Sequence, residues 1–332
     1  MVLPGYRIDL IQQKGSSRKD TQIALLRQGW LRTVFQTPMI EEALKRLEAA
    51  GSDVRAVKYE RRPSAAIDFA QSGRQRGRAA NRPNIVRVRH EGNFRRLLTV
   101  QQIAWLSSRM LRITLVGEQL EGFTSLGFDD HVKLVFESEL ASMNSTSQKP
   151  EMRDFTPRRF NVDARTLVVD FAIHDAGIAT AWATSAKVGQ KLSVGGPRGS
   201  FVIPTDIGCH LLVGDETALP AIGRRLEELT AGTRAIVVAE VDSKAEELTW
   251  TSNANLQVMW VYRRGASAGD PDALLNALTQ IALPDRDVFA WAAAESKVAR
   301  AIRHYLHTER GLDKHWIKAA GYWQRGNAGA PR

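Results

Sequence analysis

The sequence predicts two folded parts, an antiparallel β-barrel followed by an α/β unit, behind an N-terminal extension. Between about residues 85 and 203, short segments rich in β-formers alternate with polar turns, which is typical of an antiparallel barrel. After Pro204 the pattern changes, and apolar strands alternate with helical segments, as in a parallel sheet covered by helices. We therefore divide the chain into residues 1–84, 85–203 and 204–332.

The N-terminal extension carries the net charge of the chain. Residues 1–90 hold 18 lysines and arginines against 8 acidic residues, a surplus of 10, whereas residues 91–332 hold 28 of each kind. Such a basic arm can bind nucleic acid or an acidic membrane, or it can be a solvated extension that is partly helical or disordered. Residues 71–84 are rich in arginine and broken by glycine and proline, as in a linker. One segment before them has helical spacing: Ile40, Ala43, Leu44 and Leu47, ended by Gly51.

The composition excludes several classes of protein. Hydrophobic residues make up 43% and charged residues 25% of the 332 residues, which is the balance of a globular protein. No apolar run reaches the 18 or so residues of a transmembrane helix, so no membrane partner is expected. Because Cys209 is the only cysteine, an internal disulfide and a cysteine-cluster metal site are excluded. These features, with no secretion signal at the start, favour the cytoplasm.

The individual elements are placed by their apolar patterns. We expect barrel strands in IVRVRHE, LLTVQQIAWL, MLRITLVG, HVKLVFE, TPRRFNV, LVVDFAIH and QKLSVGG, with one short helix at Ile178–Lys187. In the α/β unit we expect strands in CHLLVGDE, RAIVVAEVD, LQVMWVY and DVFAWAAAE, and helices near residues 218–229, 271–281 and 295–309.

The first segment with chemical content is RDFTPR, at residues 153–158. Arg153 and Phe155 share one face of an extended strand, and Thr156 turns the other way unless the strand bends. A guanidinium, an aromatic ring and a hydroxyl are the groups that a flavin dinucleotide needs for its pyrophosphate, its ring and its N5 edge. The alternative is an ordinary strand with a solvated arginine and a core phenylalanine.

The second segment, at residues 174–183, closes an apolar strand and opens a helix with small residues. Free backbone N–H groups at such a helix start suit a phosphate, and Thr180 adds a hydroxyl donor. Alternatively, Thr180 lies along the helix and His174 is an ordinary polar residue at a strand end.

The third segment, GDETALP at residues 214–220, is the first turn of the α/β unit and lacks the glycine-rich dinucleotide fingerprint. Asp215 and Glu216 repel a pyrophosphate placed on this turn, although acidic residues near a helix start also complement its dipole. A nicotinamide dinucleotide therefore does not use the common glycine-rich cradle here.

Taken together and in this order, these segments resemble the siderophore-interacting protein family of FAD-binding ferric-chelate reductases. The resemblance covers roughly residues 85–326 and implies a ferredoxin-reductase-like two-domain flavoprotein. Its implied activity is the reduction of ferric siderophores or other ferric chelates with electrons from NADPH or NADH. The segments that carry it are RDFTPRR, IH…ATAWA…GQKLSVGGPRGSF, GDETALPAIGRRLEEL, WAAAESKVARAIRHYL and AAGYWQRG.

The resemblance also implies roles for individual residues. Phe155 stands where the family usually has tyrosine, so ring stacking is kept without a phenolic hydrogen bond, and Ala294 stands where glycine is usual. Lys133 matches a family lysine, and we expect it to contact an anionic chelate together with Arg263 and Arg325. No general base is required, so no catalytic side chain is named. The FAD-binding positions implied are Arg153, Phe155, Thr156, His174, Ala179, Thr180, Asp215, Glu216 and Thr217.

The electron donor and the class of activity leave alternatives. Glu240 ends the second strand of the α/β unit, where an acid favours a ribose hydroxyl, whereas Arg263 and Arg264 can receive a 2′-phosphate. The resemblance favours NADPH, with NADH and a reduced ferredoxin as alternatives. One rival hypothesis is a flavin-bearing protein that carries ferric siderophores without turnover. The other is a nucleic-acid-binding protein that acts through its basic arm.

Overall fold

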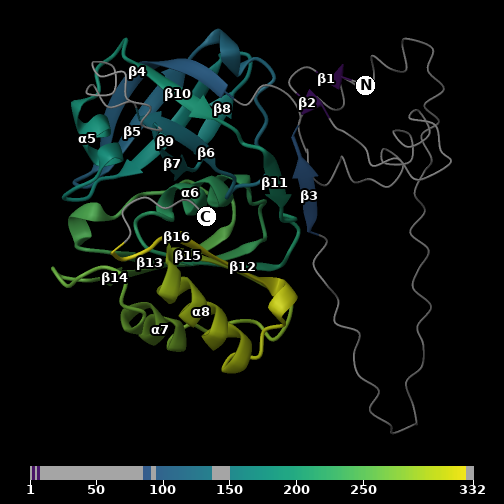
Figure 1. Cartoon of the computed structure of the whole chain (residues 1–332). Coiled ribbons are helices and arrows are strands. Elements are labelled where there is room, and N and C mark those ends of the chain that lie inside the picture. The colour runs from purple at the N-terminus through teal and green to yellow at the C-terminus, as the bar shows by residue number, and fades with distance from the viewer. Residues whose placement is uncertain (1, 4–5, 8–84, 91–94, 137–149, 327–332) are drawn as a thin grey trace, which may run out of the picture. The chain divides into compact units, whose positions relative to one another are not determined.

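The computed structural model describes residues 2–3, 6–7, 85–90, 95–136 and 150–326 (Figure 1). The chain divides into two units, residues 1–82 and residues 83–332. In the first unit, the described residues are two short strands, β1 (Val2–Leu3) and β2 (Tyr6–Arg7), which pair antiparallel. The helix expected before Gly51 and the linker expected at residues 71–84 lie outside the described residues.

The second unit begins with an antiparallel sheet, as the sequence predicts (Figure 1). Seven strands follow the order β7-β6-β10-β4-β5-β9-β8 and curl around an apolar core as a half-barrel. A separate ribbon pairs β3 (Val86–Arg89) with β11 (Gly199–Val202). The strands of the sheet are β4 (Arg95–Ser107), β5 (Met110–Val116), β6 (Val132–Phe136), β7 (Glu151–Phe155), β8 (Arg159–Asn161), β9 (Thr166–Ala172) and β10 (Lys191–Gly195). Two short helices accompany them, η1 (Glu118–Leu120) and α5 (Ile178–Ser185).

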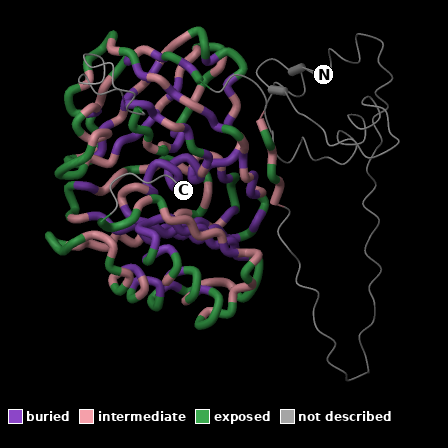
Figure 2. Tube along the Cα trace, viewed as in Figure 1, coloured by how far each residue is buried: buried purple, intermediate pink, exposed green. Residues whose placement is uncertain are grey.

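The α/β part follows with five parallel strands in the order β14-β13-β12-β15-β16. The inner strands β12 and β15 are buried along their whole length (Figure 2), because helices or the barrel cover both faces of the sheet. The strands are β12 (Cys209–Gly214), β13 (Arg234–Val241), β14 (Asn255–Tyr262), β15 (Val288–Glu295) and β16 (Ile317–Trp323). The helical elements are α6 (Leu219–Glu228), η2 (Lys244–Glu246), α7 (Asp272–Thr279), α8 (Ser296–Thr308) and η3 (Lys314–Trp316).

The predicted fold class is thus confirmed. The one helix predicted in the barrel and the three predicted in the α/β part each lie within two residues of their expected bounds at each end. We call residues 85–202 the barrel half and residues 209–326 the α/β half. In the part of the chain that the structure describes, no helix has both the length and the apolar character needed to cross a bilayer.

One apolar core joins the two halves. Met110 and Phe128 of the barrel half pack in the same cluster as Ile222, Phe289 and Trp291 of the α/β half. The rings of Phe128 and Trp291 meet edge to face at 5.3 Å. Because burial of apolar surface is the main favourable term in folding, this shared core fixes the two sheets against each other.

A cluster of arginines surrounds this core with buried polar contacts. Arg158 is 4% exposed and donates to Glu227 of α6 at 2.8 and 2.6 Å, and Arg159 adds a third and a fourth bond to the same carboxylate. From the other side, Arg224 of α6 donates to the Ser125 hydroxyl at 2.8 Å and to the Pro157 carbonyl at 3.0 Å. The residues directly after β7 are therefore held by α6.

We predict that Glu227→Gln lowers stability in a pH-dependent way. Partial burial alone would raise the pKa of Glu227, but the hydrogen bonds and charges of Arg158 and Arg159 lower it to about 2. Because the folded-state pKa lies below the usual value near 4.5, this stabilisation is present above pH 4.5 and is lost as the pH falls towards 2. The variant should lose about 2 kcal/mol of unfolding free energy at pH 7.

The measurement is urea denaturation of both proteins between pH 3 and pH 8. The difference between them should shrink at the acid end, because below about pH 4.5 the carboxylate of the unfolded protein is protonated while that of the native protein is still ionised. Glu121→Gln, a change at an exposed position, is the matched control. A difference that stays constant across the pH range would contradict the prediction.

Candidate functional site

A row of aromatic rings brings the first two chemical segments together. Phe155, the last residue of β7, lies 4.5 Å from Phe171 of β9, and Phe171 stacks on Trp182 of α5 at 5.9 Å. The row therefore links the strand that holds Arg153 to the helix that holds Thr180. The strand ends at Phe155, so Thr156 turns away from it and is buried at 7% exposure.

The start of α5 is open to an anion. Gly177 precedes the helix at a φ of 127°, no side chain caps it, and the first turn contains no acidic residue. No atom lies within 4 Å of the place where a side chain at Gly177 would begin. The hydroxyl of Thr180 accepts the backbone N–H of His174 at 3.3 Å, which leaves its proton for another acceptor. The helix start, including Ala179, thus offers N–H groups to a phosphate.

Arg153 lies on β7, at the edge of the sheet. Its side chain is a quarter exposed, and its guanidinium donates to Glu151 at 2.7 Å and to the Met152 carbonyl at 3.0 Å. Both partners are local, and the Glu151 side chain is 57% exposed. An incoming pyrophosphate can therefore replace the exposed carboxylate without uncovering a buried charge.

Tyr322 of β16 completes this region, and the sequence interpretation gave it no role. Burial of its hydroxyl and the charge of Asp129 raise the pKa of Tyr322 well above 10, although a hydrogen bond with Thr156 acts against this. The ring itself is 36% exposed. Tyr322 is therefore protonated at neutral pH and places a phenol beside the residue expected at the flavin N5 edge.

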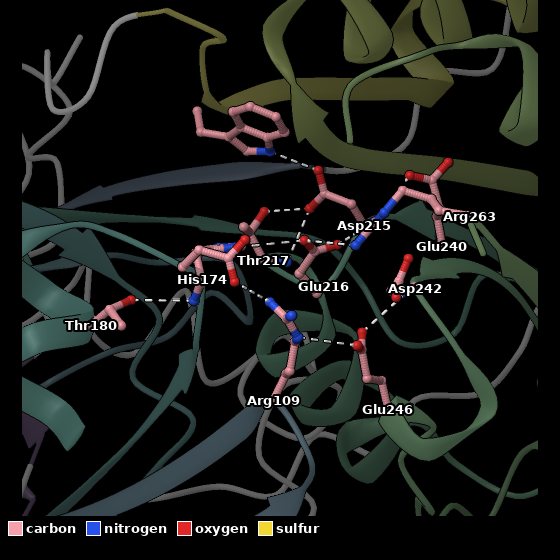
Figure 3. Close-up of polar contacts among 12 residues, drawn as sticks. Arg109, His174, Thr180, Asp215, Glu216, Thr217, Glu240, Asp242, Glu246 and Arg263 are labelled. Carbon is pink, nitrogen blue, oxygen red and sulfur yellow. Dashed lines mark hydrogen bonds and ion pairs between the residues drawn. The ribbon is translucent and has the colours of Figure 1, made fainter. Parts of the chain in front are cut away.

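The third segment forms the carboxyl edge of the parallel sheet (Figure 3). Asp215 is 3% exposed and accepts the backbone N–H of Thr217 at 3.0 Å, the N–H of Glu295 at 3.2 Å and the indole N–H of Trp323 at 2.7 Å. Burial and the neighbouring Glu216 carboxylate raise the pKa of Asp215 to about 7. The side chain fills the turn after β12, as expected from the absence of a glycine-rich cradle.

Arg263 is committed to two carboxylates (Figure 3). It donates to Glu216 at 2.7 and 3.2 Å and to Glu240 at 3.1 Å, and its side chain is 10% exposed. His174 lies on the other side of Glu216, with Nδ1 3.7 Å from the carboxylate. Glu240 is itself 3% exposed, so its carboxylate faces the protein and is not presented to a ribose.

Arg109 connects the two halves at this edge (Figure 3). It lies in the two-residue turn of the β4–β5 hairpin, between Asp175, at 3.0 Å, and Glu246 of η2, at 3.6 Å. Ser108 beside it donates to the Ala245 carbonyl through its backbone N–H, at 3.3 Å, and its hydroxyl, at 3.2 Å. No short motif signals these contacts in the sequence, because they depend on how the halves meet.

The three residues expected to contact a chelate lie in different surroundings. Lys133 pairs with Asp154 at 2.8 Å, on the face of β6 and β7 opposite to Arg153 and Phe155. Arg325 donates to the Ala268 carbonyl, and its backbone N–H donates to Glu295 at 3.3 Å.

Comparison with known proteins places this arrangement in a family. Residues 99–201 match the family model of the siderophore-interacting FAD-binding domain, and residues 208–326 match that of the siderophore-interacting protein. The NADPH-dependent ferric-chelate reductase of Escherichia coli K12 is 36% identical over 253 residues, which cover 71% of this chain and 95% of that protein. The chain belongs to the siderophore-interacting protein family.

Two further relatives extend this result. A siderophore utilization protein from T. fusca, known from its crystal structure, is 36% identical and superposes with a TM-score of 0.68, over 74% of this chain and 99% of that one. The ferric vibriobactin reductase of Vibrio cholerae is 27% identical over 247 residues, or 70% of this chain and 90% of that protein. The ferredoxin-reductase-like architecture expected from the resemblance is thereby confirmed.

We predict that Arg153→Ala weakens FAD binding by about 10- to 100-fold, the value of one charge-assisted hydrogen bond to a pyrophosphate. Glu151→Gln is the matched variant on the same strand. It removes the carboxylate that competes for Arg153, so it should bind FAD at least as tightly as the unchanged protein. Titration of the apoprotein with FAD, followed by flavin fluorescence, measures both. Equal losses in the two variants would show that Arg153 acts only through the local fold.

Proposed function

We propose that this protein is an FAD-dependent reductase of ferric siderophores or other ferric chelates, with NADPH as electron donor. The observation that carries the proposal is the aromatic row from Phe155 to Trp182, which links the strand that holds Arg153 to helix α5 and its open start. The E. coli relative, an NADPH-dependent ferric-chelate reductase, and the match to the siderophore-interacting FAD-binding domain support the same conclusion.

The residues present fit an FAD molecule. In our proposal, the N–H groups at the start of α5, the Thr180 hydroxyl and the Arg153 guanidinium bind the pyrophosphate. Phe155 offers its ring to the flavin, and Thr156 offers a hydroxyl hydrogen-bonded to Tyr322. His174, Glu216 and Thr217 border the site, while Asp215 holds the strands around it rather than touching the cofactor.

The chemistry explains why a flavin is needed. Bound FAD would supply hydride acceptance from NADPH and one-electron transfer to ferric iron, so that each NADPH consumed would give NADP⁺, one proton and two ferrous ions. Ferrous iron binds hard oxygen ligands less tightly than ferric iron, so the chelate releases it. The protein therefore supplies binding and orientation, and no side chain has to act as a general base.

Arg325 is the proposed contact for an anionic chelate, because it is exposed and its guanidinium donates to a backbone carbonyl, that of Ala268, so it can reorient towards a ligand. Lys133 lies on the face of β6 and β7 opposite to Arg153 and Phe155, away from the proposed flavin ring, so it has no part in this contact. Arg263 has a different role in this scheme, because Glu216 and Glu240 already neutralise it. The cytoplasm is the proposed location, on the grounds of the single cysteine and the need for NADPH.

The proposal is tested with the purified full-length chain. We expect a yellow protein that binds FAD in stoichiometric amount, is bleached by NADPH without oxygen and regains its colour when a ferric catecholate or hydroxamate is added. A ferrous-specific chelator in the same cuvette should report two ferrous ions per NADPH consumed. Reduced protein that binds the chelate but keeps its flavin reduced would identify a carrier, and a chain that takes up no FAD would overturn the proposal altogether.

A further inference from the structure

The parallel sheet ends at a strand that is suited to pairing with another strand. β14 is eight residues long, reads NLQVMWVY and contains no charged residue, proline or glycine. It is the outermost strand in the order β14-β13-β12-β15-β16 (Figure 1). Long apolar edge strands of this kind pair readily with a strand of another chain, because their outer backbone groups have no partner within the sheet.

The other edge strands of the two large sheets differ from β14. In β7 three of the five residues are charged, and β8 has only three residues. β16 contains Lys318, its register against β15 shifts at Glu295, and the Arg303 guanidinium donates to its Ile317 carbonyl at 3.0 Å. Charge, short length and irregular register are the features that keep sheet edges from pairing. Among these four described edges, only β14 lacks all of them.

The outer backbone groups of β14 follow from its register against β13. The Asn255 N–H donates to the Thr233 carbonyl at 2.8 Å. At the other end of the strand, the Arg263 N–H donates to the Val241 carbonyl at 2.9 Å, so the odd-numbered residues face β13. Because the peptide groups of successive strand residues alternate in direction, the even-numbered residues present theirs outwards. The outward residues are Leu256, Val258, Trp260 and Tyr262.

The two faces of β14 are covered by the chain itself, so the edge is what remains for a partner. On one face, Met259 packs against the core that contains Leu274 and Leu278 of α7. On the other face, Trp260 stacks on Trp250 at 5.2 Å. The residues from Val258 to Tyr262 are nevertheless all partly exposed, as expected for a strand that is open along one side.

We propose that β14 pairs antiparallel with β14 of a second copy of this chain, about a two-fold axis at Met259. This register places Leu256 opposite Tyr262 of the second copy. Val258 then lies opposite Trp260 of the second copy, so all the outward peptide groups gain partners. Because the strand has no charged residue, no like charges oppose each other. A second copy fits this edge because a two-fold axis lets one strand satisfy itself and closes the assembly at two chains.

The pairing leaves the proposed flavin region free. That region includes the ends of β7 and β16, and β16 lies at the opposite end of the parallel sheet from β14. The inference therefore does not depend on the proposed function.

The mass of the purified full chain in solution tests the proposal. Pairing along one strand buries less area than a standard interface, so we expect a dissociation constant of roughly 1–100 µM. Sedimentation equilibrium from about 1 to about 300 µM chain should show the mass rising from 36.9 kDa towards twice that value. A mass that stays at 36.9 kDa over the whole range would overturn the proposal.

A cysteine at the two-fold axis tests the register. Opposite residues there form a non-hydrogen-bonded pair with Cα atoms about 4.5 Å apart, within reach of a disulfide. Met259→Cys should therefore give a disulfide-linked dimer with oxidised glutathione, seen as a band of doubled mass on a non-reducing gel. The native Cys209 is buried, so the unchanged protein should give no such band.

Gln257→Cys is the matched control. Gln257 lies opposite Val261 of the second copy in this register, so its own counterpart is about 13 Å further along and the two cysteines should stay unlinked. Equal cross-linking of both variants, or cross-linking of neither, would rule out the axis at Met259. None of these measurements needs a flavin or turnover, so their failure would leave the reductase proposal intact.

Discussion

The hydrogen bonds to the buried carboxylate of Asp215 are the constraint on which the α/β half depends. This one side chain ties the turn after β12 to the end of β15 and, through Trp323, to the end of β16. A buried carboxylate without hydrogen-bond donors would lower the folding stability by several kcal/mol. The donors to Asp215 are therefore strongly favoured to stay in place. Tyr322, the residue before Trp323, is positioned against Thr156 as a consequence.

In the barrel half, apolar contacts hold the segments of the site together. Its site depends on two segments that lie about 25 residues apart in the sequence and in different elements, and Phe171 is the residue that joins them by touching both Phe155 and Trp182. The hydrogen bonds of Asp215 thus position the end of β16, and the aromatic contacts of Phe171 position the end of β7.

Much of this could be predicted from the sequence, for physical reasons that differ by region. Strand and helix periods are local, so the barrel, the parallel sheet and the open helix start at Gly177 could be predicted. The hydrogen-bond and ion-pair partners of the charged side chains could not be predicted, because they depend on which surfaces meet in the folded protein. From the sequence we expected Arg263 to be available to a ligand, but two carboxylates bind it. We expected Glu240 to suit a ribose, but it is buried. No sequence pattern indicated the ion pairs of Arg109.

The shared core and the arginines around α6 have a consequence for the catalytic cycle. Many oxidoreductases shield their chemistry by swinging one lobe over the other, which requires a hinge with few contacts. Here Phe128 packs against Trp291, and Arg158 and Arg224 make hydrogen bonds across the same interface. A swing of one lobe over the other would have to break these contacts, so we expect the two lobes to keep this arrangement when a chelate arrives and leaves.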